Sequence, residues 1–238
     1  MLTKLRVKLW SVVMEMCKSV EVKDLFLCKT PYIKPLFEGV RYPWELLSSL
    51  RTYIETLVAR GIEGFTLLKE GVLVGEGVVI HPSAVIEPPA IIGAHTELRP
   101  SAYVRGCVIV GEGCVVGNST ELKNAILLDY VQVPHYNYVG DSVLGNHAHM
   151  GAGAICSNLK ADGRAVVVHG DVDYPTGLRK VGGILGDHAD IGCGCVLSPG
   201  TVIGQNTSAY PLVHLRGVYP SHAIIKGTDC VVKKEDKH

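Results

Sequence analysis

From residue 74 onward, aliphatic side chains recur at every sixth position, and this period constrains the fold more than any other feature of the chain. Ten such positions follow one another without a break: Val74, Ile80, Ile86, Ile92, Leu98, Val104, Val110, Val116, Leu122 and Leu128. Amphipathic helices repeat every 3.6 residues and half-buried strands every two, so neither explains a period of six. A hexapeptide repeat is typical of a parallel β-helix, in which three short strands form one triangular coil.

The series changes register after Leu128 and is later interrupted. The anchors that follow the change, and those that follow the interruption, are Val133, Val139, Leu144, Met150, Cys156, Leu185, Ile191, Leu197 and Ile203. A solenoid accommodates an insertion as a loop at one corner. Residues 159–184 are therefore expected to form an arm beside the coils, with a strand at residues 166–168.

The residues before the repeat carry a helical pattern. Pro43 suits the first turn of a helix through residues 44–58, and Gly61 suits its end. We interpret residues 1–20 as an amphipathic helix rather than a signal peptide, because Glu15 interrupts the apolar run. The sequence thus predicts an N-terminal helical segment over residues 1–73 and a mainly β domain over residues 74–238.

The charge balance and the cysteines bound the partners and the compartment. The chain has 23 Lys and Arg residues and 23 Asp and Glu residues, so we expect no nucleic acid partner. Apolar runs fall short of the roughly 18 residues that cross a bilayer, so we expect no membrane partner. The eight cysteines lie in aliphatic patterns, which indicates small buried hydrophobes in a reduced, cytoplasmic protein. Cys193 and Cys195 have no second pair at zinc-site spacing, so we expect no metal.

Several short motifs occur within the repeat in a recognisable order. They are LRP at 98–100, GNSTELK at 117–123, PHYNYVGD at 134–141, MGAGA at 150–154, and Asn158. Over about residues 74–210 they resemble the acetyltransferase half of the bifunctional bacterial enzyme that makes UDP-N-acetylglucosamine. The resemblance implies a left-handed parallel β-helix, a homotrimer, and acetyl transfer from acetyl-CoA to the amine of glucosamine 1-phosphate or a related amino-sugar phosphate. The uridylyltransferase half is not expected, because the first 73 residues hold no glycine-rich nucleotide loop.

Carried over by position, the resemblance assigns roles in catalysis and cofactor binding. His135 corresponds to the general base, and Asn158 to the residue that orients the amine and the base. Ala152 and Gly153 correspond to the turn near the thioester oxygen of acetyl-CoA. A neutral imidazole suits proton removal at neutral pH, and backbone N–H groups can stabilise a developing oxyanion.

The resemblance also implies residues that bind the acceptor. Arg99, Lys123 and Tyr138 correspond to the grip on the sugar phosphate, a reasonable combination of guanidinium, ammonium and phenol. His149 stands where the family has an asparagine that contacts the sugar. Arg164 aligns with the last phosphate-binding lysine of the family, which retains the charge but not the geometry.

Two alternatives stay open on the residues alone. A β-helix can be a catalytically silent scaffold or regulatory protein, since a fold does not prove an activity. A zinc carbonic anhydrase of the β-helix type is less favoured: His147 and His149 would share a strand face, but a third histidine is not evident. Arg99, Lys123 and His135 are 24 and 12 residues apart, so they need not share one edge of a coil. A trimer groove is therefore the expected place for these side chains to meet.

Overall fold

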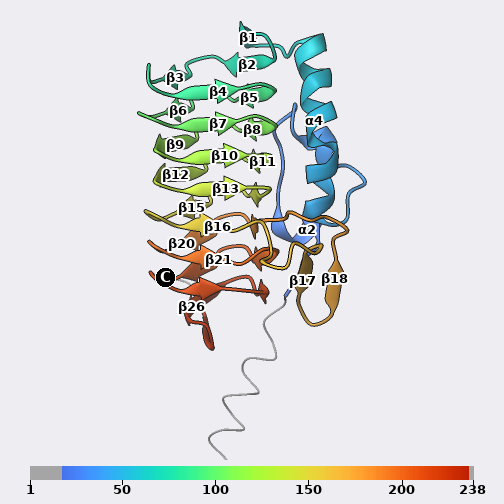
Figure 1. Cartoon of the computed structure of the whole chain (residues 1–238), viewed down its shortest axis with the longest axis vertical. Helices are drawn as coiled ribbons and strands as arrows, with labels where there is room; N and C mark the ends of the chain where they lie inside the picture. Colours follow the sequence, from blue (N-terminus) through green and yellow to red (C-terminus); the bar gives the residue numbers. More distant parts are fainter. Residues whose placement is uncertain (1–17, 236–238) are drawn as a thin grey trace, which may run out of the picture.

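A computed structural model describes residues 18–235, which form a three-sided parallel β-helix with helices along one side (Figure 1). Followed from its N-terminal end, the coil is left-handed. The predicted fold class is therefore confirmed. The amphipathic helix expected in residues 1–20 falls almost entirely on residues 1–17, outside the described part of the chain.

Each full turn places one strand in each of three sheets, which we call sheets A, B and C. Sheet A contains β1 (Phe65–Lys69), β2 (Val72–Gly75), β5 (Ala90–Ile92), β8 (Val108–Val110), β11 (Ala125–Leu127), β14 (Val143–Leu144), β19 (Gly183–Leu185), β22 (Thr201–Ile203) and β25 (Val218–Tyr219). Sheet B contains β3 (Val79–Ile80), β6 (Glu97–Leu98), β9 (Val115–Asn118), β12 (Gln132–His135), β15 (His149–Met150), β20 (Asp190–Ile191), β23 (Ser208–Ala209), β26 (Ala223–Gly227) and β27 (Cys230–Lys233). Sheet C contains β4 (Val85–Glu87), β7 (Tyr103–Arg105), β10 (Glu121–Lys123), β13 (Tyr138–Gly140), β16 (Ile155–Cys156), β21 (Val196–Leu197) and β24 (His214–Leu215).

An antiparallel hairpin lies at each end of the parallel stack. At the first end β1 pairs antiparallel with β2, across the boundary expected at residue 73. At the other end β27 pairs antiparallel with β26. The added strands hydrogen-bond to the backbone of the outermost parallel strands, which would otherwise present open edges for pairing with other chains.

The predicted anchors line the interior of the coil, with one correction. Leu127, not Leu128, points into the interior core, and Leu128 packs in a second core outside the coil. The reason is a shorter coil: Val110 is paired with Leu127 in sheet A, 17 residues later. The register therefore changes one residue earlier than predicted.

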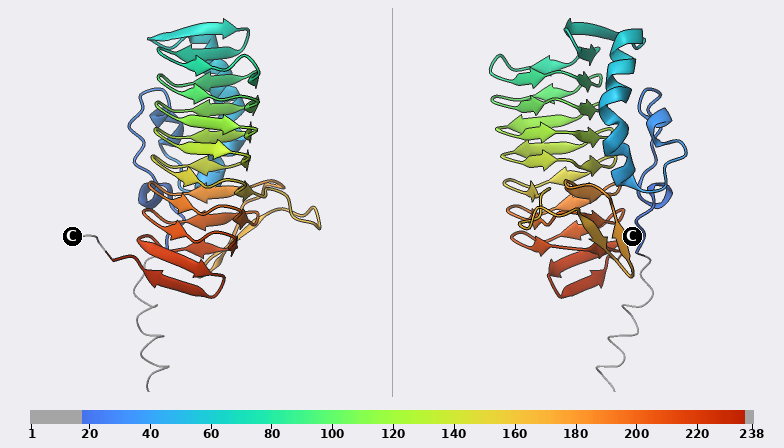
Figure 2. Two further views of the ribbon diagram at one scale, coloured as in Figure 1. Left: turned by 90° about the vertical axis from the view of Figure 1, so that its left-hand side faces the viewer. Right: turned by 45° about the vertical axis from the view of Figure 1, so that its right-hand side comes forward.

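The outer face of sheet A forms this second core with the N-terminal segment. Ile91, Ile109 and Ile126 are fully buried in the same cluster as Leu50 and Ile54 of the long helix. The helices are α2 (Val22–Leu25), α3 (Lys34–Phe37) and α4 (Pro43–Arg60). Figure 2 shows α4 running along the coils, whereas no described helix covers sheets B and C. No described helix has both the length and the apolar character that a membrane span needs.

The interruption of the repeat is an arm that leaves the coil after β16 and returns at β19, as predicted (Figure 2). Its strands β17 (Val167–His169) and β18 (Asp173–Pro175) form an antiparallel hairpin. Val166 and Val168 are fully buried in the second core. The Tyr174 ring packs 5.7 Å from the ring of Tyr42, between centroids. The arm is thereby anchored beside the N-terminal segment.

Candidate active site

Six of the residues that the resemblance singled out in the coil lie at two corners, at opposite ends of the short strands of sheet C, whereas Tyr138 and His149 lie within strands. The corner between sheets B and C, here the B–C corner, carries His135, Ala152 and Gly153, and Arg99 follows directly after β6 of sheet B. The corner between sheets C and A, here the C–A corner, carries Lys123 and Asn158. One chain therefore does not unite all of them in one groove.

At the B–C corner, the backbone of His135 is held from inside the coil. Its N–H donates to Oδ1 of Asn137 (3.1 Å), and its carbonyl accepts from the N–H of Gly153 (3.0 Å). Asn137 is buried, and its Nδ2 donates to the carbonyl of Gly151 (2.8 Å). Because these bonds use only the backbone of His135, its imidazole stays exposed at the corner.

The Ala152–Gly153 turn lies directly beside His135 in the next coil. Gly153 adopts φ 70°, and a Cβ added there would meet nothing within 4 Å, so the space beside the turn is open. The Gly153 N–H is already bonded to His135. The N–H of Ala152 has no acceptor among the residues that the structure describes. Of the two backbone donors in the turn, Ala152 is the one available to a ligand.

Sequence reasoning missed Cys193, which lies one coil beyond Ala152. The N–H of Gly194 donates to the carbonyl of Ala152 (2.8 Å), so the Cys193 turn and the Ala152 turn are neighbours at the B–C corner of successive coils. Cys193 and Cys230 are exposed, so the expectation that the cysteines are buried hydrophobes is wrong for these two. A signal was present: Gly192 and Gly194 flank Cys193 just as Gly151 and Gly153 flank Ala152.

At the C–A corner, the carboxylate of Asp141 organises the side chains. It accepts from Nζ of Lys123 (3.3 Å), Nδ2 of Asn124 (2.8 Å) and Nδ2 of Asn158 (2.5 Å). Asp141 is only 4% exposed. A buried carboxylate needs this many donors, because its desolvation is costly. Asp141 stands at the end of the motif at 134–141, but no role was assigned to it from the sequence.

The side chain of Tyr138, in β13 of sheet C, reaches toward the C–A corner. Its ring crosses Gly140, where an added Cβ would lie 2.5 Å from the Tyr138 hydroxyl oxygen. That hydroxyl accepts a hydrogen bond from Nδ2 of Asn158 (3.1 Å). Burial raises the pKa of the Tyr138 phenol, so the phenol stays protonated near neutral pH. The amide of Asn158 is thus held by both Tyr138 and Asp141.

Each of the three cations predicted to bind phosphate is paired with a carboxylate. The pairs are Arg99 with Glu97 (3.1 Å), Lys123 with Asp141 (3.3 Å) and Arg164 with Asp162 (2.8 Å). The Arg164 side chain is 81% exposed on the arm and contacts none of the other predicted site residues. A cation that is already neutralised is a weaker ligand for an added anion.

His149 and His147 do not share a strand face. His149 lies in β15, and its Nδ1 is 2.8 Å from Oδ1 of Asp190, a hydrogen bond that lowers the pKa of Asp190. His147 occupies a corner with φ 56°, where its ring stacks between Tyr130 (4.9 Å) and His188 (4.8 Å). Across residues 18–235, no group of three His, Cys, Asp or Glu side chains could hold a metal ion.

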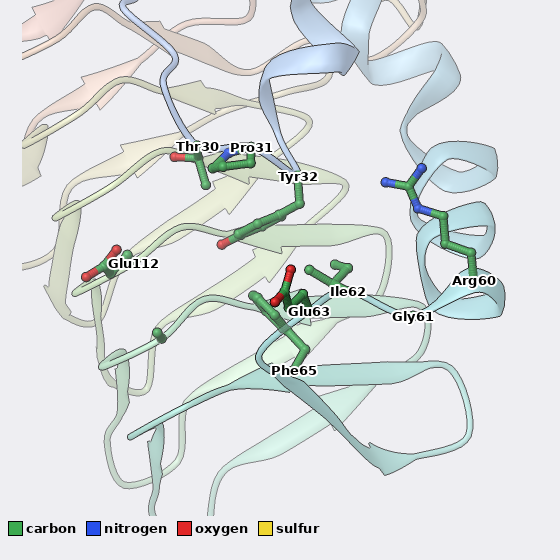
Figure 3. Close-up of a pocket in the computed structure, with 10 residues that line it drawn as sticks. Thr30, Pro31, Tyr32, Arg60, Gly61, Ile62, Glu63, Phe65 and Glu112 are labelled. Atoms are coloured by element: carbon green, nitrogen blue, oxygen red, sulfur yellow. The ribbon is translucent and has the colours of Figure 1, made fainter.

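Two cavities lie along the N-terminal segment. The first, of about 490 Å³, is formed where residues 30–32 approach the end of α4 (Figure 3). Its lining includes Tyr32, whose buried hydroxyl has no partner in the described part of the chain, but none of the predicted site residues. The second, of about 440 Å³, adjoins the C–A corner. It is lined by Leu47, Ser48, Asn124, Asp141, Leu159, Leu178, Arg179 and Lys180.

Comparison with known proteins extends the motif resemblance. The family model of the GMPPB C-terminal domain matches residues 62–174. The bifunctional protein GlmU of Methanococcus maripaludis (strain C5) is 34% identical over 174 residues, which cover 72% of this chain and 42% of GlmU. The resemblance to the bifunctional enzyme is confirmed. The chain spans less than half the length of this GlmU relative.

Two further proteins match this chain over a shorter stretch or at lower sequence identity. The bifunctional sugar-1-phosphate nucleotidylyltransferase/acetyltransferase of Sulfurisphaera tokodaii is 34% identical over 113 residues, which cover 47% of this chain and 28% of that protein. The solved structure of the UDP-N-acetylglucosamine acyltransferase from Campylobacter jejuni is 20% identical, with a TM-score of 0.36. That match covers 63% of this chain and 72% of the acyltransferase.

Proposed function

We propose that the protein is a CoA-dependent N-acetyltransferase that moves the acetyl group of acetyl-CoA to the amine of an amino-sugar phosphate such as glucosamine 1-phosphate. The observation that carries this proposal is the hydrogen-bonded juxtaposition of exposed His135 with the Ala152–Gly153 turn, in a chain 34% identical to a GlmU. A general base and an available backbone donor beside each other are what acyl transfer to an amine requires.

The B–C corner forms the half of the site that binds the acetyl donor, and the thioester reacts there. The amine nitrogen of the acceptor attacks the thioester carbonyl carbon, while the imidazole of His135 removes a proton from that nitrogen. The N–H of Ala152 donates a hydrogen bond to the oxyanion of the tetrahedral intermediate. Collapse of the intermediate breaks the carbon–sulfur bond, and the imidazolium of His135 returns the proton to the departing CoA thiolate.

At the C–A corner, the acceptor half of the site orients the amino sugar. Asn158 is pre-organised by Asp141 and Tyr138, so its amide can position the acceptor at little entropic cost. Lys123 contributes positive potential at this corner although it is paired with Asp141, and Arg99 contributes it from the B–C corner although it is paired with Glu97. His149 lies on the outer face of sheet B, where its contact with Asp190 would have to open for it to touch a sugar.

A homotrimer would bring the two halves together. The N-terminal segment covers sheet A, which leaves sheets B and C as the walls without a helical cover in the described residues. In a closed ring of three, the C–A corner of one copy faces the B–C corner of the next, so that every interface is the same. Each interface would then hold one complete site. The free cysteines suit the reducing conditions of the cytoplasm.

The test of this function is acetyl transfer measured by release of the CoA thiol. With acetyl-CoA as donor, we expect thiol release with glucosamine 1-phosphate and slower release with glucosamine, which lacks the phosphate. Glucose 1-phosphate, which has no amine, should give none. Folded protein that releases no thiol with any of a panel of amino-sugar phosphates would contradict the proposal and favour the silent scaffold.

The position of Cys193 gives an independent test of the acetyl-CoA site. If the thioester lies against the Ala152 turn, the neighbouring coil is covered, and Cys193 should react more slowly with N-ethylmaleimide. At acetyl-CoA ten times its Kd, mass action predicts about tenfold slowing, measured by mass spectrometry of the labelled peptides. Cys230 is also exposed but lies in the terminal β27, and it serves as the matched control.

Comparing the labelling rates of Cys193 and Cys230 distinguishes protection by acetyl-CoA bound at the B–C corner from a general slowing of the labelling reaction. Unchanged labelling of Cys193 at saturating acetyl-CoA, or equal slowing of Cys193 and Cys230, would contradict the placement of the cofactor at the B–C corner.

A further inference from the structure

The cavity beside the C–A corner contains two cations that no carboxylate neutralises. Among residues 18–235, neither Arg179 nor Lys180 lies within ion-pair distance of an acidic side chain. Two further basic residues, Lys160 and Arg164, lie in the first half of the arm and share the carboxylate of Asp162 (3.6 and 2.8 Å). The unpaired positive charge of the arm is therefore concentrated in its return segment, residues 178–182.

This return segment is fixed directly against the C–A corner. Lys180 forms an antiparallel bridge with Leu159. The next two residues continue the contact: the N–H of Val181 donates to the carbonyl of Asn158 (3.1 Å), and that of Gly182 to the carbonyl of Asp141 (2.7 Å). These backbone bonds hold the two cations beside Asn158 without using their ammonium or terminal guanidinium groups.

The cavity has the size and the chemistry for a phosphoryl group attached to a sugar. Its volume is about 440 Å³, and Leu47 and Ser48 of α4 line it together with the arm. The carboxylate of Asp141 is the one acidic group in the lining, and Lys123 already neutralises it. The Nε of Arg179 donates to the carbonyl of Gly163 (3.3 Å), which orients the guanidinium and leaves its terminal N–H groups for an anion.

We propose that Arg179 and Lys180 bind the phosphoryl group of the acceptor in this cavity, and that Arg164 does not. The inference rests on the proposed function, because that function supplies the amino-sugar phosphate. A phosphate in the cavity accepts hydrogen bonds from the guanidinium and the ammonium, while the sugar extends toward Asn158. The arm and α4 thereby become determinants of acceptor specificity.

The test compares two double variants that remove the same charge from the same arm. Arg179→Gln with Lys180→Gln should raise the Kd for glucosamine 1-phosphate about 10- to 100-fold, measured by calorimetry, because two charge-assisted hydrogen bonds are lost. Lys160→Gln with Arg164→Gln should change it less than about twofold, because both cations are paired with Asp162. The Kd for acetyl-CoA and the Tm should be the same in both variants, which excludes a folding defect.

Kinetics and inorganic phosphate separate this inference from the proposed function. In the first double variant KM for glucosamine 1-phosphate should rise while KM for unphosphorylated glucosamine does not. Equal effects of the two double variants, or no effect of the first, would overturn the assignment to Arg179 and Lys180. If the wild type binds inorganic phosphate through these two residues but transfers no acetyl group, the anion site stands and the proposed function fails. If the wild type binds neither phosphate nor glucosamine 1-phosphate, the anion site itself is refuted.

Discussion

Replacing His135 with alanine should lower kcat for acetyl transfer by about 10²–10⁴-fold, the usual contribution of a general base. The Kd for acetyl-CoA should stay the same, because the cofactor is expected to contact the backbone of the Ala152 turn rather than the imidazole. Steady-state thiol release with glucosamine 1-phosphate measures the first quantity, and calorimetry measures the second. The loss then belongs to the chemical step and not to cofactor binding.

His147→Ala is the matched control for this variant. His147 is exposed at a corner of the same coil region, but its ring stacks on Tyr130 and His188 rather than facing the Ala152 turn. Its removal should leave kcat within about twofold, as expected for an exposed side chain outside the reaction. Normal turnover of His135→Ala on the best acceptor would show that the carried-over mechanism is wrong.

Mixing two inactive variants should restore activity if each site is built from two copies of the chain. His135→Ala destroys the B–C corner of its own chain, and Asn158→Ala destroys the C–A corner. In randomly mixed trimers, about one quarter of the interfaces should join an intact B–C corner to an intact C–A corner. Turnover should therefore rise from near zero to about one quarter of the wild-type rate, measured after the two proteins are dissociated together and reassembled.

The control for mixing uses a chain with both substitutions. His135→Ala mixed with the His135→Ala, Asn158→Ala double variant contains no intact B–C corner, so no activity should return. Native mass spectrometry establishes that mixed trimers have formed. Mixed trimers that stay inactive would mean that His135 and Asn158 do not act across an interface. A stable monomer in light scattering at micromolar concentration would refute the trimer itself.

The fold was predictable because the interior of each coil depends on local sequence. Every sixth residue must be aliphatic to fill the triangular interior, so the strand order and the excursion of the arm follow from spacing alone. The one misplaced anchor has a specific cause. Leu127 and Leu128 are both leucines, and both are buried, one inside the coil and one against the N-terminal segment. Side-chain type could not distinguish the two faces where the coil shortens to 17 residues.

The candidate site was predictable only in part. The motifs gave His135 and the Ala152 turn roles in one reaction, and the structure places the two next to each other at the same corner of neighbouring coils. The motifs could not identify Arg179 and Lys180, because an alignment without gaps follows chain distance and assigned the phosphate role to Arg164. The antiparallel return of the arm instead brings residues about twenty positions later against Asn158.

The sequence by itself determined the parallel β-helix, the place of the arm and the corner that carries His135, because a short repeat dictates which side chains point inward and which corners stack. Only the tertiary structure decided which charges are available. Glu97, Asp141 and Asp162 neutralise the three cations expected from the sequence, whereas the cavity beside α4 is lined by two exposed cations that have no such partner in the described residues. Ion pairing depends on distances of a few ångströms between segments, and these distances exist only once the arm has folded against the coil.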